Sequence, residues 1–250
     1  MNTEFYLKNP PIKEVALALY ITSADFDSIF IEKFKNNILQ DYPEILSLQT
    51  FNISIKDGKE ISVSKKDNIN SYSLSNTTKT EIWNVDINRI LFSDKNKYED
   101  FDNFLEKFVR KYSFVYSNLK EDAKVSLLAL RYSNEFSFSF DKLQEIFSIL
   151  PLFQQNYNNE FYASNISHMN VANIVNVNNE RMTSLVNTMF RVNEVDNTKI
   201  IVNFDIEVKY NIDNANIMDI ECLKRYLMEM RLFKNKIFFA NFPKAKEVFN

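Results

Sequence analysis

The chain of 250 residues contains a single glycine, Gly58. Glycine adopts positive φ without strain and lets backbone N–H groups approach a phosphate closely. The sequence accordingly has no G-x-x-x-x-G-K phosphate loop, no G-x-G-x-x-G dinucleotide turn and no G-x-S-x-G nucleophile elbow. Gly58 follows Asp57, and this Asp-Gly pair predicts the turn of a β-hairpin.

Histidine and cysteine also occur once each, as His168 and Cys222. One histidine excludes an H-E-x-x-H motif and a zinc site built on several imidazoles. His168 lies in a predicted strand region, where a hydrogen-bonded residue at a sheet edge is the simpler interpretation and a general base the alternative. We interpret Cys222 as a small buried hydrophobe, because it lies among apolar positions of a predicted helix.

The charge balance predicts no strong attraction to nucleic acid or to anionic membranes. The chain has 33 acidic and 30 basic residues and a net charge of −3, and its basic pairs are scattered and flanked by acids. The first residues lack the pattern of a signal peptide, and no segment approaches the roughly 20 apolar residues of a membrane span. We therefore expect a cytoplasmic protein without a membrane partner, and nucleic acid is not a favoured ligand.

Hydrophobic periodicity predicts a mixture of strands and helices. Strands are expected over residues 12–22, on both sides of the Asp57-Gly58 turn, and over 72–75, 80–92, 125–140, 161–169, 172–177, 183–192 and 200–210. Helices are expected over residues 26–40, with capping residues at 23–25, and over 98–116, 141–150 and 218–233. Residues 237–249 are expected to form a short strand or helix.

This order of elements favours the α+β class, with antiparallel meander sheets and helices packed on one face. The polar, Asn-rich residues 154–159 are the best candidate linker. They separate an N-terminal lobe, residues 1–153, from a C-terminal lobe, residues 160–250, which we expect to pack as one globular unit. The two lobes repeat a similar order of strands and helices.

The segment Arg131-Tyr132-Ser133-Asn134 interrupts the apolar first half of a long predicted strand. A charged residue directly after Leu128-Ala129-Leu130 is expected to be partly buried, and a buried arginine needs a carboxylate partner or an anionic ligand. Two interpretations remain open for Arg131: an internal salt bridge, or a contact to an anion or a partner peptide. Tyr132 and Asn134 join it as candidate binding residues.

Asp205 and Glu207 share one face of a predicted strand, two residues apart. Their carboxylates are candidate ligands of Mg²⁺ or Mn²⁺, with Asp86 as a third ligand from the other lobe. Alternating charges on a solvated strand face explain the pattern equally. No cofactor is expected if the protein only binds a partner. Mg²⁺ or Mn²⁺ is expected if it is a metal-dependent enzyme.

Several short segments together resemble a sporadically distributed family of uncharacterised bacterial proteins. The opening Asn9-Pro-Pro-Ile-Lys-Glu-Val15 is similar to the N-P-P-I-x-E-A/V start of that family, and Arg131-Tyr-Ser-Asn134 to its R-Y-x-N strand. Phe204-Asp-Ile-Glu207 and Phe238-Phe239 resemble its acidic strand and closing F-F segment. One departure is Ala129, where the family usually has glycine. The resemblance implies no catalytic activity, and the family's patchy distribution is like that of genes on mobile or defence-related islands.

Three hypotheses about function follow. The first is a non-catalytic binding protein that contacts another protein or a second copy of itself, such as a defence-system, antitoxin or immunity component, because its aromatic and methionine residues suit protein interfaces. The second is a metal-dependent enzyme acting on nucleic acid or nucleotides through Asp205 and Glu207. The third is an anion-binding sensor that uses Arg131.

Overall fold

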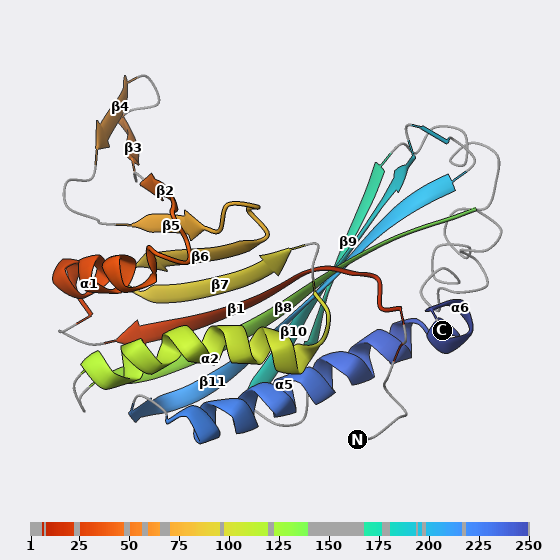
Figure 1. Ribbon diagram of the computed structural model, residues 1–250. Coiled ribbons are helices and arrows are strands. Elements are labelled where there is room, and N and C mark those ends of the chain that lie inside the picture. The colour runs from red at the N-terminus through yellow and green to blue at the C-terminus, as the bar shows by residue number, and fades with distance from the viewer. Residues whose placement is uncertain are drawn as a thin grey trace. The chain divides into compact units, whose positions relative to one another are not determined.

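The protein has a mixed fold of antiparallel sheet and helices, as the α+β prediction requires (Figure 1). A computed structural model describes residues 7, 9–22, 26–47, 51–56, 60–65, 71–95, 98–119, 123–139, 168–176, 181–193, 195–196, 199–216 and 219–249. The described strands form a nine-stranded sheet of order β2-β5-β6-β7-β1-β8-β11-β10-β9 and a separate two-stranded sheet, β3-β4.

The strands of the larger sheet are β1 (Ile12–Thr22), β2 (Glu44–Ser47), β5 (Tyr72–Ser75), β6 (Glu81–Asp86), β7 (Arg89–Lys95), β8 (Lys124–Ser139), β9 (His168–Asn176), β10 (Met182–Val192) and β11 (Lys199–Asn216). The hairpin consists of β3 (Phe51–Lys56) and β4 (Glu60–Lys65). The helices are α1 (Ser28–Ile38), α2 (Phe101–Asn118), α5 (Ile220–Asn241) and α6 (Ala245–Phe249).

The chain divides into two compact units. Unit 1 comprises Met1–Val15, Leu130–Tyr210 and Arg225–Asn250, and unit 2 comprises Ala16–Ala129 and Asn211–Lys224. Strands β1, β8 and β11 each contribute residues to both units. The predicted linker at residues 154–159 lies outside the described residues, so the division into lobes 1–153 and 160–250 stays a prediction.

Unit 2 has an aromatic core between its strands and the helices α1 and α2. Trp83 of β6 is fully buried and stacks on Phe92 of β7 and Phe108 of α2, at centroid distances of 4.7 and 5.5 Å. Phe34 of α1 meets the same indole edge-on at 5.7 Å. Helix α2 can supply this core because its apolar residues recur every three or four positions, which places them on one face. The buried residues of that face are Phe101, Phe104, Leu105, Phe108, Tyr112 and Val115.

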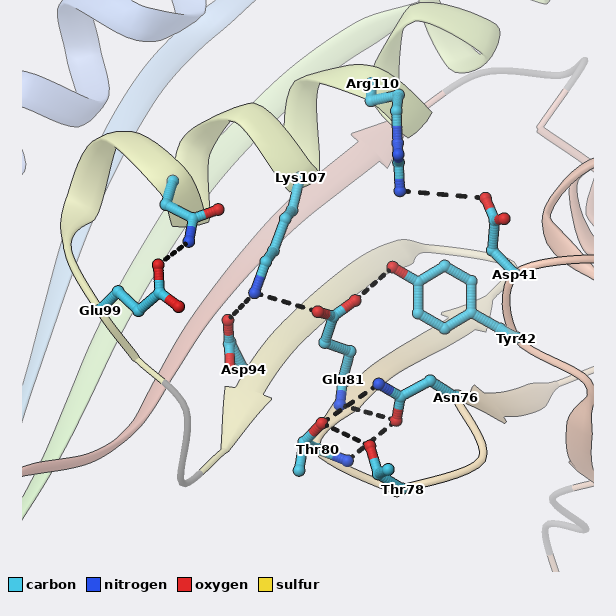
Figure 2. A network of polar contacts seen from close by, with 11 residues as sticks. Asp41, Tyr42, Asn76, Thr78, Thr80, Glu81, Asp94, Glu99, Lys107 and Arg110 are labelled. Carbon is cyan, nitrogen blue, oxygen red and sulfur yellow. Dashed lines mark hydrogen bonds and ion pairs between the residues drawn. The ribbon is translucent and has the colours of Figure 1, made fainter.

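A polar network connects α2 to the strands of unit 2 (Figure 2). The ammonium group of Lys107 donates to Asp94 Oδ2 at 2.7 Å and lies 3.0 Å from Glu81 Oε1. The hydroxyl of Tyr42 donates to the other oxygen of Glu81 at 2.9 Å. Burial raises the pKa of Asp94, and the hydrogen bond from Lys107 opposes that shift. The ammonium group of Lys107 on α2 thus balances two carboxylates of the strands. We infer that these contacts help to fix α2 on the sheet.

In unit 1, helix α5 packs on strands β8 and β11. Phe204 of β11 contacts Phe238 and Phe242 edge-on, at 6.1 and 4.8 Å. Phe136 of β8 meets Phe242 at 5.2 Å and Phe249 of α6 at 5.8 Å. The apolar side chains of the two strands alternate with polar ones, so one face of the sheet is buried under the helices and the other is left for polar residues.

The structure corrects several predictions about secondary structure. Residues 80–92 do not form one strand, because the backbone turns at residues 87–88 between β6 and β7, where Asp86 Oδ1 accepts a hydrogen bond from the Asn88 N–H at 3.0 Å. The N-cap of α1 is Asp27, not one of residues 23–25. The last long helix continues to Asn241 rather than ending at residue 233.

Other predictions agree with the structure or cannot be compared with it. Strands β3 and β4 pair antiparallel on either side of residues 57–59, as the Asp57-Gly58 pair predicts. The turn residues themselves lie outside the described residues. The same holds for the predicted helix at 141–150 and for most of the predicted strand at 161–169.

Candidate functional site

The alternation of β8 places the predicted site residues on two different faces of the unit 1 sheet. Tyr132 and Asn134 are buried on the face that α5 covers, where the Asn134 side-chain amide donates to the carbonyl oxygen of Phe204 at 2.8 Å. Arg131, between buried Leu130 and Tyr132, points to the opposite side, and its side chain is 50% exposed. We call this second side the open face. It contains Arg131, Glu135, Ile174, Leu185, Asn187, Arg191, Asp205, Glu207 and Lys209.

Arg131 forms an ion pair with Asp205 of β11, between its Nη2 and Asp205 Oδ2. Burial acts to lower the pKa of Arg131, but the hydrogen bond and charge of Asp205 outweigh it and the pKa is raised. Of the two interpretations drawn from the sequence, the structure therefore shows the internal salt bridge. The half-exposed side chain of Arg131 agrees with the partial burial expected from the sequence, and the strand turns it away from α5.

Asp205 and Glu207 lie on the same face of β11, as their spacing predicts. Glu207 Oε1 is 3.3 Å from Lys209 Nζ, so each of the two carboxylates already has a cationic neighbour. Asp205 Oδ1 and the side-chain oxygen of its cross-strand partner Asn187 are buried without a hydrogen bond. Among the residues that the structure describes, no group of three His, Cys, Asp or Glu side chains could hold a metal ion.

The third proposed metal ligand, Asp86, belongs to unit 2, whereas Asp205 and Glu207 belong to unit 1. Asp86 Oδ2 lies 3.2 Å from the guanidinium group of Arg89, three residues along the chain. The structure thus gives each of the three predicted ligands a basic neighbour. Local cations of this kind compete with a divalent metal for the carboxylate oxygens.

Further ion pairs continue the open face toward its other strands. Glu135 of β8 lies 3.6 Å from Lys13 of β1 and 3.7 Å from Arg191 of β10. Acidic and basic groups therefore alternate across the strands and neutralise one another locally. Such a surface differs from the clustered basic face that nucleic-acid binding requires.

An apolar pair lies on the open face beside these ions. Ile174 of β9 and Leu185 of β10 are direct cross-strand partners, and they are 74% and 39% exposed. Strand β9 is the last strand in the order of the described sheet. The sequence does not single out this pair, because Ile174 is followed by Val175 and Leu185 by Val186, and neither strand alternates clearly at these positions.

His168 is the first residue of β9, and its cross-strand partner is Arg191. This position agrees with the interpretation of His168 as a residue of a sheet edge. Cys222 lies in the first turns of α5 and is partly exposed, so the expectation of a buried cysteine is wrong.

Lys234 of α5 is the residue of chemical interest that the sequence interpretation missed. It is 9% exposed, and its ammonium group lies 4.0 Å from the centroid of the Tyr132 ring. Burial lowers the pKa of Lys234 to about 7, and the charge of Arg231 one turn earlier adds to that shift. The sequence feature that indicates its burial is its spacing from Leu223, Leu227 and Met230, because this spacing continues the apolar stripe of the helix.

No protein-family model matches the chain, and no curated protein matches it either. None of the helices that the structure describes is long and apolar enough to cross a membrane.

Proposed function

We propose that the chain is a non-catalytic binding protein, and that strand β9 with the adjoining open face of unit 1 binds an extended segment of another protein. The observation that carries this proposal is the exposed pair Ile174–Leu185, which lies on the open face at the last two strands of the described sheet. Isolated exposed apolar residues are common. An exposed apolar pair that joins the last strand of the described sheet to its neighbour is instead a site where another strand can pack.

The edge position supports an extended ligand. A terminal strand has backbone N–H and C=O groups along its outer side that a partner strand can bind, and alternate partner side chains then fall on one face. On the open face those side chains meet Ile174, and beyond it Leu185. We therefore expect the partner segment to carry apolar residues at every second position.

The charges of the open face support a protein ligand rather than a free anion or a metal ion. Arg131 is paired with Asp205, and Glu207 with Lys209, so neither sign is in excess at the centre of the face. Charges that are paired within one surface can still orient a protein partner and discriminate between partners, and they add no net charge to the surface. A role in a defence, antitoxin or immunity system agrees with the resemblance set out above and is part of the same proposal.

The proposal is tested with peptides selected from a random library on the immobilised protein. We expect the selected sequences to share apolar residues at alternate positions, and Ile174→Lys to weaken their binding at least about tenfold, or ~1.4 kcal/mol. The matched control is Ile29→Lys, because Ile29 is 63% exposed on α1 of unit 2.

Two results would contradict this function. One is a set of selected peptides that bind Ile174→Lys as tightly as the unchanged protein. The other is a selected set without alternation whose binding is lost in Ile29→Lys. Circular dichroism of both variants verifies that each remains folded.

A further inference from the structure

An open pocket of about 440 Å³ lies in unit 2, between the last turn of α1 and the C-terminal half of α2. Its volume falls within the range of small-molecule sites, about 300–1,000 Å³. The lining residues include Asn37 of α1 and Arg110, Phe114 and Ser117 of α2. The side chains of Asn37 and Ser117 are exposed and, within the described part of the chain, make no intramolecular hydrogen bond. Their polar groups are therefore available to a ligand.

The pocket carries an excess of positive charge. Arg110 and Lys111 of α2 share a single carboxylate, that of Asp41. The hydrogen bond from Lys111 lowers the pKa of Asp41, so this carboxylate stays ionised. Arg110 reaches from α2 toward the same carboxylate (Figure 2), but its Nη2 lies 3.9 Å from Asp41 Oδ2, which is longer than a hydrogen bond. The guanidinium group of Arg110 thus keeps donors for a further oxyanion.

The helix end that borders the pocket has some of its acceptors already bonded. The C-terminus of a helix carries partial negative charge, because its last carbonyl groups lack partners within the helix. In α2 the carbonyl oxygen of Phe114 accepts a hydrogen bond from the Asn118 side-chain amide at 2.9 Å. The carbonyl oxygen of Val115 accepts one from the Leu119 N–H at 3.1 Å. The wall of the pocket therefore opposes an anion less than a bare helix end would.

Phe114 gives the pocket an apolar surface. Its half-buried ring packs against Phe30 and Phe34 of α1, at centroid distances of 6.2 and 6.1 Å. These contacts hold the ring in place while part of it lines the pocket. A planar group of a ligand can stack on such a ring. A molecule that joins a planar ring to an oxyanion can therefore contact Phe114 and Arg110 at once.

We propose that this pocket binds a small organic anion, whose phosphate or carboxylate group pairs with Arg110 and whose planar ring lies on Phe114. Arginine suits both oxyanions, because its planar guanidinium group can donate two parallel hydrogen bonds to either. Asn37 and Ser117 hydrogen-bond to the polar groups of the ligand. The pocket belongs to unit 2, whereas the peptide site proposed above belongs to unit 1. The two proposals therefore fail or succeed independently.

Isothermal titration calorimetry with AMP and benzoate tests this proposal, because these probes carry the two kinds of oxyanion on planar rings. Adenosine and benzamide are the matched compounds without the charged group. We expect AMP or benzoate to bind at millimolar concentrations or below, and its uncharged counterpart to bind at least about tenfold more weakly. The probe that binds identifies the oxyanion that the pocket prefers.

A substitution of the arginine locates the site. Arg110→Gln should weaken binding of the probe at least about tenfold, because it removes the charge that pairs with the oxyanion. Arg181→Gln, at an exposed position of unit 1, is the control and should leave the affinity unchanged. Circular dichroism should show that Arg110→Gln remains folded, since the side chain of Arg110 is 63% exposed.

Three results would overturn the proposal. The first is that neither AMP nor benzoate binds to the unchanged protein at millimolar concentrations. The second is that Arg110→Gln binds the probe as tightly as the unchanged protein. The third is an equal loss of affinity in Arg110→Gln and Arg181→Gln, which would show a general effect of net charge instead of a site.

Discussion

Lys234 is a buried basic residue, and we expect its charge to lower the stability of the folded protein. It occupies a position of α5 that faces the sheet, next to the ring of Tyr132, and Arg231 is the charged neighbour that shifts its pKa. The ring favours the ammonium form by about 0.5–2 kcal/mol, but the loss of hydration is the larger effect. A buried cation is thus tolerated at a cost in stability.

The lowered pKa gives a testable dependence of stability on pH. The pKa is about 7 in the folded protein and about 10.4 in an unfolded chain. Between these values the unfolded chain binds more protons, so the free energy of unfolding should rise with pH from about 7 to about 10. Urea unfolding at several pH values should show that Lys234→Met raises stability at pH 7 by on the order of 2 kcal/mol and removes most of this rise.

Lys236, exposed on the same helix, supplies the control for that measurement. Lys236→Met should leave the pH profile unchanged. If Lys234→Met instead destabilised the protein at pH 7, the ammonium group would make contacts whose favourable energy exceeds the cost of its burial.

At the scale of the elements, α2 shows how local sequence determines where a helix begins. Asp100 precedes the first turn, and its carboxylate accepts a hydrogen bond from the Asn103 N–H at 2.7 Å. The backbone of Asp100 is extended, as an N-cap requires. The predicted start at residue 98 lies three residues before the observed one, because the apolar periodicity was extended past this cap.

Removal of the cap should therefore have a measurable cost. Asp100→Ala should lower the free energy of unfolding by about 1 kcal/mol, since it leaves an N–H of the first turn without its partner. Asp102→Ala is the matched comparison, because Asp102 lies in the first turn without the capping role. Equal effects of the two substitutions in urea unfolding would show that charge near the helix end, and not the cap, is responsible.

The elements also show what could be predicted from sequence. Strong alternation located β11, and a clear apolar stripe located α2, because each pattern has one dominant period. The turn between β6 and β7 was missed because Ile87 and Asn88 continue the alternation of their neighbours. Of the candidate site, the shared face of Asp205 and Glu207 follows from spacing. Their pairing with Arg131 and Lys209, and the burial of Lys234, depend on which face of the sheet α5 covers.

At the scale of the whole molecule, the order of the strands in the sheet, and not their order along the chain, determines which strands lie at its two ends. The nine-stranded sheet ends in β2 on one side and β9 on the other among the described strands, and these strands belong to different units. Each carries exposed apolar side chains, Leu46 on β2 and Ile174 on β9. Both end strands of the described sheet thus carry an exposed apolar side chain, and the function proposed above uses the one on β9.

Hydrogen–deuterium exchange with and without a selected peptide shows directly whether β9 and the open face bind an extended protein segment. A partner strand bonds to outward N–H groups of the edge strand, so the amides of β9 should exchange more slowly in the complex. We expect protection of residues 168–176 that is absent with Ile174→Lys. Protection confined to β2 and the β3–β4 hairpin, or no change in β9 at saturating peptide, would contradict it.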